Sequence, residues 1–315
     1  MNHLDHRQRT LGIIALAGAS AIWGGMYVAT AALMRQTPPL VVLELREAIA
    51  GLILVPIAWR SGRLRIARGD LALAAAIGIV GFTVSIGLQL EGTHIAGAAL
   101  GSLITASSPV LIALLGRVWL RERLPWPKLV AILVAVGGVA LIAGHPPGGP
   151  QVEPGIIDLA GAALAWAIYT VGSAHLTRRY DALGVLAIAC IVGSVTSLPF
   201  ALASASHAAH PLPTTLVAWL EVAYISIAGM ALAFFLWNWG FGRVDAAVGG
   251  SMLLFQPLVG VVLGIVLLAE PITLTLVFGG FLVVAGVSGA VAIATPRVQL
   301  ATNASPEAPQ SGIRT

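Results

Sequence analysis

The segment GSLITASSPVLIALLGRVWLRERL occupies residues 101–124, and a related segment, GSMLLFQPLVGVVLGIVLLAEPI, occupies residues 250–272. Both are apolar runs that contain a proline and end in a turn with a glutamate. Pro109 and Pro257 are 148 residues apart in the chain, and so are Glu122 and Glu270. A constant separation between corresponding residues indicates that the chain contains an internal repeat.

The composition of the surrounding chain favours the lipid bilayer as its solvent. Of the 315 residues, 58% are hydrophobic and 10% are charged, and the mean hydropathy is +0.93. A soluble domain typically carries about 25% charged residues. The net charge of +4 comes mostly from arginine, and the basic residues form no stripe with interleaved aromatics of the kind that binds nucleic acid. We therefore expect a membrane protein with no nucleic-acid partner.

Apolar runs of about 20 residues predict membrane-spanning helices, because each residue adds 1.5 Å along a helix and the hydrocarbon layer is about 30 Å thick. Ten such runs occupy residues 11–31, 40–59, 71–90, 95–119, 127–143, 156–175, 183–202, 216–239, 246–268 and 273–294. The sequence thus predicts an all-α membrane protein. Residues 1–145 and 152–296 form its two five-helix repeats, and the polar residues 297–315 form a disordered cytoplasmic tail.

The distribution of positive charge predicts the orientation of these helices. Cytoplasmic loops are enriched in lysine and arginine. If both termini are cytoplasmic, 15 of the 17 basic residues fall on the cytoplasmic side. Arg35 is then in an outer loop and Arg46 is within the second helix. Because each repeat contains an odd number of helices, the two repeats must lie in opposite orientations.

The N-terminus could instead belong to a cleavable signal peptide, because a basic start precedes the small residues Ala17-Gly18-Ala19. Cleavage there would remove the first helix of the first repeat. We therefore expect the segment to be retained, and the chain to be a multi-pass protein of the cell inner membrane.

Several motifs resemble one known family. Ala106-Ser107-Ser108-Pro109, followed by Glu122-Arg123-Leu124, resembles the fourth-to-fifth-helix segment of the drug/metabolite transporter superfamily, EamA type. Trp23-Gly24-Gly25 and Arg46 are also similar to that family, and the resemblance covers about residues 10–295. It implies that the first, third, fourth, sixth, eighth and ninth helices line a central cavity and that the fifth and tenth are peripheral. It also implies export of amino acids or other metabolites.

Aromatic pairs occur in corresponding helices of the two repeats. Trp23 and Tyr27 are four residues apart, and Trp166 and Tyr169 are three apart, so each pair shares one helix face. Mirrored aromatic faces predict a cavity wall that binds an apolar or aromatic side chain. Ordinary helix packing is the alternative interpretation.

Two prolines are candidate hinges, and the polar residues directly before them are candidate contacts to the substrate. Pro109 and Pro257 fall near the centres of the fourth and ninth helices, where each removes a backbone hydrogen bond, so we expect kinks that act as hinges. Static kinks that only shape packing are the alternative. Ser108 and Gln256 could hydrogen-bond a substrate, or they could bond the local backbone instead.

Charged residues within a membrane-spanning helix are costly and are usually functional. Glu44 and Arg46 in the second helix have this character, and their separation of two residues places them on different faces. Glu44 lies close enough to the outer end for its side chain to reach the membrane surface. We therefore treat a role of the charge of Glu44 or Arg46 in transport as a hypothesis.

Four residues lie near the expected membrane surfaces. Trp237 and Asn238 could form the inner mouth of a cavity or belong to an interfacial aromatic belt. Glu122 and Glu270 are expected to face the positive N-terminal ends of the fifth and tenth helices. Pro271, directly after Glu270, departs from the family pattern.

The sequence also limits the classes of function. It contains no phosphate-binding loop, nucleophile elbow or metalloprotease motif, so an intramembrane enzyme is a weak alternative. His207 and His210 lack a third metal ligand, and we expect no metal or cofactor. We predict a secondary transporter, monomeric or homodimeric, that exports amino acids, aromatic or apolar ones in particular, by alternating access. Efflux of cationic or lipophilic compounds is the alternative, with Glu44 or Glu47 as the counter-charge.

Overall fold

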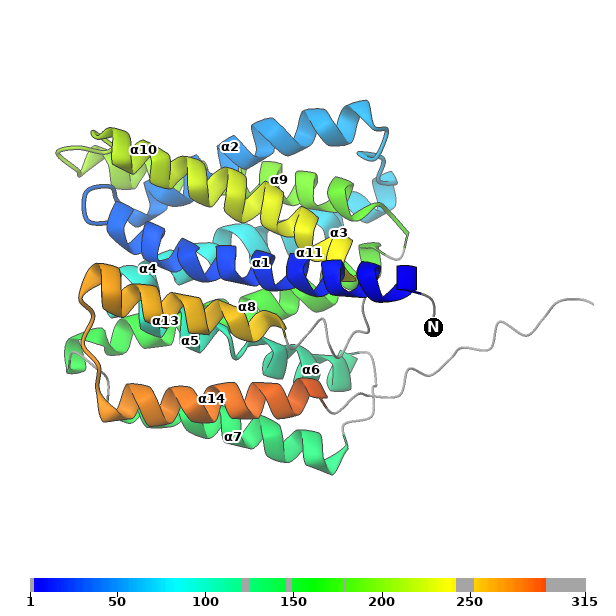
Figure 1. Cartoon of the computed structure of the whole chain (residues 1–315). Coiled ribbons are helices and arrows are strands. Elements are labelled where there is room, and N and C mark those ends of the chain that lie inside the picture. Colours follow the sequence, from blue (N-terminus) through cyan, green and yellow to red (C-terminus); the bar gives the residue numbers. More distant parts are fainter. Residues whose placement is uncertain (1–2, 120–124, 146–148, 178, 242–251, 293–315) are drawn as a thin grey trace, which may run out of the picture.

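The computed structural model describes residues 3–119, 125–145, 149–177, 179–241 and 252–292, and all regular elements within these residues are helical. The helices lie side by side in one bundle (Figure 1). The first half of the chain contains α1 (His3–Leu33), α2 (Pro39–Arg60), α3 (Arg68–Gly78), η1 (Ile79–Ser85), α4 (Ile86–Ala96), α5 (Ala98–Thr105), α6 (Ser108–Trp119) and α7 (Trp126–Gly144). The second half contains η2 (Pro150–Val152), α8 (Glu153–Thr177), α9 (Ala182–Ser206), α10 (Leu216–Ala223), η3 (Tyr224–Leu232), α11 (Ala233–Phe241), η4 (Met252–Leu254), α13 (Phe255–Leu268) and α14 (Leu274–Ala292).

The apolar runs in the sequence correspond to these helices. Within the described residues, the segments long and apolar enough to cross a bilayer are Arg7–Leu33, Arg68–Ala96, Pro150–Ser173, Ala182–Ser206 and Leu216–Trp237. The shorter apolar helices are Ala98–Ile112, Trp126–Ile142, Phe255–Leu268 and Leu274–Gly289. The expectation of an all-α, multi-pass membrane protein is therefore confirmed. The fourth run differs from the expectation, because it is divided into α5 and α6.

The N-terminus and the α2–α3 connection lie at the same end of the bundle (Figure 1). This end, which we call the basic end, contains Arg63 and Arg179 among other arginines. Arg63 lies 3.8 Å from Asp181, and Arg179 lies 3.5 Å from Asp70. The hydroxyl of Tyr180 donates a 2.6 Å hydrogen bond to Asp70, and this bond raises the pKa of Tyr180. These contacts connect the α2–α3 segment with the α8–α9 segment.

Helices α7 and α14 form a closely packed pair at one edge of the bundle (Figure 1). A Cβ atom at Gly138 would lie 2.6 Å from the carbonyl oxygen of Gly279, and one at Gly286 would lie 2.6 Å from that of Ala131. Small residues thus let the two backbones approach each other, as is common between helices in membranes. This pair corresponds to the peripheral fifth and tenth helices that the family resemblance implies.

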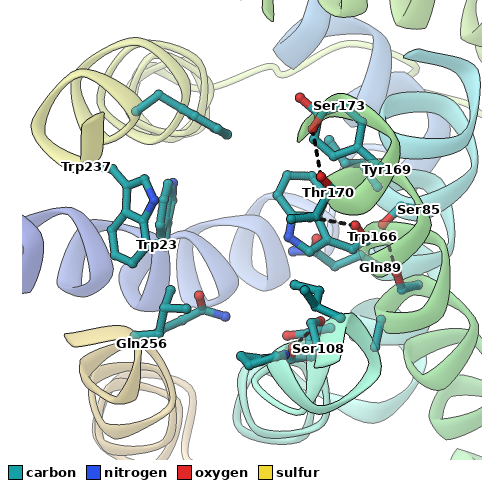
Figure 2. Close-up of a pocket in the computed structure, with 18 of the residues that line it drawn as sticks. Trp23, Ser85, Gln89, Ser108, Trp166, Tyr169, Thr170, Ser173, Trp237 and Gln256 are labelled. Carbon is teal, nitrogen blue, oxygen red and sulfur yellow. Dashed lines mark hydrogen bonds between the residues drawn. The ribbon is translucent and has the colours of Figure 1, made fainter. Parts of the chain in front are cut away.

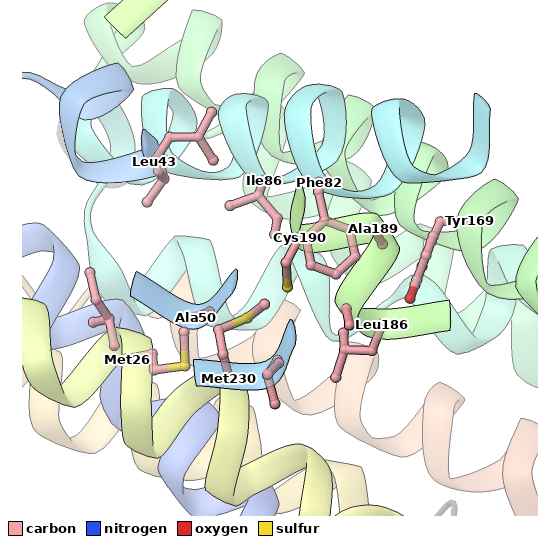
Figure 3. Close-up of a cluster of buried hydrophobic side chains, with 14 of the residues drawn as sticks. Met26, Leu43, Ala50, Phe82, Ile86, Tyr169, Leu186, Ala189, Cys190 and Met230 are labelled. Carbon is pink, nitrogen blue, oxygen red and sulfur yellow. The ribbon is translucent and has the colours of Figure 1, made fainter. Parts of the chain in front are cut away.

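Two segments of the bundle are π-helical, which the sequence did not lead us to expect. η1 continues α3 into α4, and η3 continues α10 into α11, so each interrupts the third helix of its half. π-helical turns are rare and often occur at functional sites. Both segments contribute to the largest buried apolar cluster of the described residues, through Phe82 of η1 and Met230 of η3, together with Met26 of α1 (Figure 3).

Candidate substrate cavity

A cavity of about 450 Å³ lies in the interior of the bundle. Residues of both halves line it, from α1, α2, η1, α4, α5, α6, α8, α9, α11, η4 and α13. All six helices expected from the family resemblance contribute, together with α2 and α9. The lining extends to Thr177 and Ala182, which are exposed at the basic end. The cavity is therefore a pocket that reaches from the middle of the bundle toward that end.

Aromatic side chains form two facing walls of the cavity (Figure 2). On one side, the ring of Trp23 lies 5.2 Å from that of Trp237 and 5.3 Å from that of Phe234. On the other side, the rings of Trp166 and Tyr169 are 5.0 Å apart. The indoles of α1 and α8, which belong to different halves of the chain, thus face one shared space.

The Trp23-Gly24-Gly25 motif has a direct structural explanation. The indole N–H of Trp23 donates a 2.9 Å hydrogen bond to the carbonyl of Gly229 in η3, which fixes the ring at the cavity wall. A Cβ atom at Gly24 would lie 2.5 Å from the carbonyl oxygen of Gln256, and one at Gly25 would lie 2.5 Å from the hydroxyl of Tyr224. Both glycines therefore allow α1 to pack closely against neighbouring helices.

The polar candidates also line the cavity, although some of them are engaged locally. Tyr27 is bonded through its hydroxyl to Thr105. The hydroxyl of Ser108 donates a 2.6 Å hydrogen bond to the carbonyl of Thr105, which matches the local backbone bonding considered as the alternative for this residue. Gln256 and Gln89 also line the cavity (Figure 2).

The two prolines do not lie in the middle of continuous helices. Pro109 is the second residue of α6, directly after the turn at residues 106–107 that separates α5 from α6. Pro257 is the third residue of α13, after the short helix η4. A proline is favoured in the first turn of a helix because no backbone N–H is needed there. The expected mid-helix kinks are therefore helix starts, and the hinge role stays a prediction.

The charged residues of α2 are divided between the cavity and the α2–α9 contact. Arg46 lines the cavity and is 6% exposed. Glu44 accepts hydrogen bonds of 2.6 Å from Ser194 and 2.7 Å from Ser197, both on α9. Glu44 is thus held between two helices, and its side chain does not need to reach the membrane surface.

Other sequence candidates lie elsewhere or outside the described part of the chain. Pro257 is buried but is not among the described residues that line the cavity. The backbone of Asn238 belongs to α11, and its side chain lies outside the described part of the structure. Trp237 lines the cavity, whereas an interfacial belt was the alternative for it. The lining residues not predicted from the sequence include Ser85, Phe234, Thr170 and Ser173.

Glu270 does not face the helix that follows it. Its carboxylate accepts hydrogen bonds of 2.5 Å from Ala98 N and 2.7 Å from Ala99 N, so it caps α5 of the other half. The expectation that Glu270 faces the start of the tenth helix is therefore wrong, although its interaction with a positive helix end is of the expected kind. Glu122 lies outside the described residues.

A helical membrane bundle around a central cavity defines the class of a multi-pass membrane transporter. The sequence model of the EamA-like transporter family matches residues 10–144 and 153–292, and the chain belongs to this family. The predicted membership of the drug/metabolite transporter superfamily is thereby confirmed. The assignment of a transporter rather than an enzyme is confirmed as well, because the relatives are transporters.

Individual relatives agree with this assignment. The "uncharacterized transporter YetK" of Bacillus subtilis is 30% identical over 87% of this chain and 84% of its own length. The "probable terminal-alkyne amino-acid exporter" of Streptantibioticus cattleyicolor is 31% identical over 76% of this chain and 82% of its own length. A crystal structure that is 22% identical in sequence matches with a TM-score of 0.62 over 89% of this chain and 96% of its own, which supports the fold.

Proposed function

We propose that this protein is a secondary transporter of the cell inner membrane that exports amino acids, in particular those with aromatic or apolar side chains. The observation that carries the proposal is the cavity of about 450 Å³ with facing indoles from both halves of the chain. Cavities that bind small molecules are mostly apolar, have volumes of about 300–1,000 Å³ and contain a few polar groups. Aromatic rings on two sides suit an apolar or aromatic side chain between them.

The proposed architecture is ten membrane-spanning helices in two inverted repeats, residues 1–145 and 152–296, with both termini in the cytoplasm. The constant separation of 148 residues between matching positions and the position of Arg63 and Arg179 at the basic end support it. Inverted repeats allow two conformations of similar energy, in which the cavity opens to opposite sides. With the basic end in the cytoplasm, the cavity opens inward.

Close packing supports the closed state of the opposite end. A Cβ atom at Gly92 of α4 would lie 2.7 Å from the carbonyl oxygen of Gly155 in α8. Glu270 joins the segment after α13 to α5 at that same end. These contacts connect the two halves where the cavity would have to open outward, so alternating access would require them to separate.

The choice between amino acids and cationic compounds rests on the charge in the cavity. None of the described residues that line it is acidic, and Arg46 contributes a positive charge. Glu44, one of the two counter-charges considered for a cation, is bonded to α9 instead. A relative described as a probable amino-acid exporter gives further support to amino acids as the substrate class.

The proposal is tested by counterflow in proteoliposomes preloaded with an unlabelled amino acid. Uptake of the labelled amino acid is expected for the natural protein. It should fall strongly for Trp23→Ala, which removes a cavity wall, but not for Trp59→Ala, because that indole is 70% exposed near the end of α2. If a panel of aromatic and apolar amino acids gives no counterflow with the natural protein, the proposed substrate class is wrong.

A further inference from the structure

Arg46 brings a positive charge into the interior of the bundle. It lies about 10 Å along α2 from the first residue, Pro39, at 1.5 Å of rise per residue. Its side chain lines the cavity and is 6% exposed. A buried guanidinium is costly in a membrane unless an acceptor or an anion lies next to it.

The hydrogen-bond donors of Arg46 are largely unused. A guanidinium has five N–H donors. One nitrogen, Nη2, lies 3.3 Å from the sulfur of Met230, which is a weak acceptor. The Nε atom is buried and has no hydrogen-bond partner among the described residues.

The acidic residues of α2 do not satisfy these donors. Glu47 follows Arg46 in the chain, but its carboxylate lies against Gly193 of α9, and neither of its oxygens has a hydrogen-bond partner among the described residues. Glu44 is bonded to Ser194 and Ser197. Glu47 therefore balances the charge of Arg46 from a distance without occupying its donors.

The neighbourhood of Arg46 within the protein offers little else. Besides Glu47, the side chains near the guanidinium in the described part of the chain are Met230 and Cys190, which are weakly polar, and Tyr27, whose hydroxyl is bonded to Thr105. The cavity is thus the direction from which a strong acceptor can reach the guanidinium. A carboxylate is the best match, because its two oxygens can accept two parallel N–H···O bonds from one guanidinium.

We propose that Arg46 binds the carboxylate of the transported substrate and thereby restricts transport to small carboxylates. This inference rests on the proposed function and specifies the recognition at the same cavity. The carboxylate lies at the α2 wall, and the side chain of the substrate lies between the indoles of Trp23 and Trp166. Compounds of the same shape without a carboxylate are rejected, because they leave the guanidinium buried and without an acceptor.

Matched pairs of an amino acid and its decarboxylated amine test the proposal. The pairs are phenylalanine with phenethylamine, tryptophan with tryptamine, and leucine with isoamylamine. Binding to the purified full-length protein in detergent is measured by calorimetry, and counterflow is measured in proteoliposomes. We expect at least one amino acid to bind about tenfold or more tightly than its amine, and 3-phenylpropionate to bind better than phenethylamine.

Two variants extend the test to the residue itself. Arg46→Gln should weaken binding of the amino acid and of 3-phenylpropionate by about tenfold or more, and it should not weaken binding of the amine, because the amine is a cation that Arg46 repels. Arg46→Lys should recover part of the affinity, because lysine restores the charge but lacks the planar guanidinium that can donate two parallel hydrogen bonds to a carboxylate. Arg35→Gln is the matched control, because Arg35 is exposed and lies outside the cavity. If Arg46→Gln does not fold, the pairs of compounds still decide the question with the natural protein.

The outcomes separate the two proposals. Equal or tighter binding of the amines by the natural protein would overturn the role of Arg46 while leaving a transporter of small molecules in place. Unchanged amino-acid affinity in a folded Arg46→Gln variant would overturn it as well. Failure of the natural protein to bind or transport any compound in the panel would overturn the proposed function, and the inference with it.

Discussion

The carboxylate of Glu270 accepts a 2.5 Å hydrogen bond from the backbone N–H of Ala98, a residue 172 positions earlier in the chain. The bond connects the segment after α13 with the first turn of α5, where Gly97 has a positive φ of 89°. A Cβ atom at Gly97 would lie 2.7 Å from a carboxylate oxygen of Glu270, so a glycine is needed there. The two halves are thus joined at the end of the bundle opposite the basic end.

Removal of this carboxylate should loosen that end. Glu270→Ala leaves two backbone N–H groups without their acceptor, and we expect a loss of about 1–3 kcal/mol of stability, visible as a lower Tm in detergent. Glu270→Gln keeps one acceptor oxygen, so its Tm should lie between that of the natural protein and that of Glu270→Ala. An unchanged Tm for Glu270→Ala would show that the contact contributes nothing to stability.

Two glycines of α1 offer a matched comparison of packing. Gly24→Ala would bring a Cβ atom to 2.5 Å from Gln256 O and 2.9 Å from the Cβ atom of Val259, and we expect a loss of about 1–3 kcal/mol. At Gly18, a Cβ atom would meet nothing within 4 Å. Gly18→Ala should therefore be neutral or slightly stabilising, because alanine favours a helix. Thermal unfolding of both variants measures the difference, and equal Tm values would contradict the close approach of α1 and α13.

The indole wall of α8 should affect large substrates more than small ones. Trp166→Leu removes a ring that lies 5.0 Å from that of Tyr169 at the cavity. We expect the KM for an aromatic amino acid to rise about threefold to tenfold in counterflow, with a smaller change for alanine. Equal effects on both substrates would instead indicate a general disturbance of α8.

The contact between Tyr180 and Asp70 can be followed by titration. The hydrogen bond to Asp70 raises the pKa of Tyr180, so the neutral hydroxyl is favoured in the folded protein. Its contribution to stability is complete below the ordinary tyrosine pKa of about 10 and is lost as the pH rises through the higher folded value. The ultraviolet difference spectrum between the natural protein and Tyr180→Phe reports this tyrosine alone. Asp70→Asn should shift its titration to lower pH, and no shift would exclude Asp70 as the cause.

The hydropathy pattern predicted most of the helices, because the apolar runs of this chain have the length of a membrane-spanning helix. The break between α5 and α6 was predicted only in part from the sequence. Pro109 has no N–H to donate to the carbonyl of Thr105. The hydroxyl of Ser108 donates a hydrogen bond to that carbonyl instead. Such local bonding was considered, but its result, two separate helices, was not predicted.

Contacts between distant segments could not be read in the same way. Glu270 was assigned to the nearest helix start, whereas the structure pairs it with α5, which is remote in the chain. The third apolar run was expected to end at residue 90. In the structure, α4 continues to Ala96, since Gly92 packs closely against α8. Sequence patterns report what a residue needs but not which distant partner supplies it.

The π-helical segment η1 has a consequence for comparisons between relatives. Successive residues of an α-helix are rotated by about 100° around its axis. A π-helical turn holds about one residue more than an α-helical turn, so a relative with one residue fewer between Gly78 and Ile86 and an uninterrupted α-helix would keep its residues matching Ile86 and Gln89 directed toward the cavity. An alignment gap in this segment therefore has stereochemical meaning: it marks the extra residue of the π-helical turn, and aligned residues on its two sides keep equivalent directions.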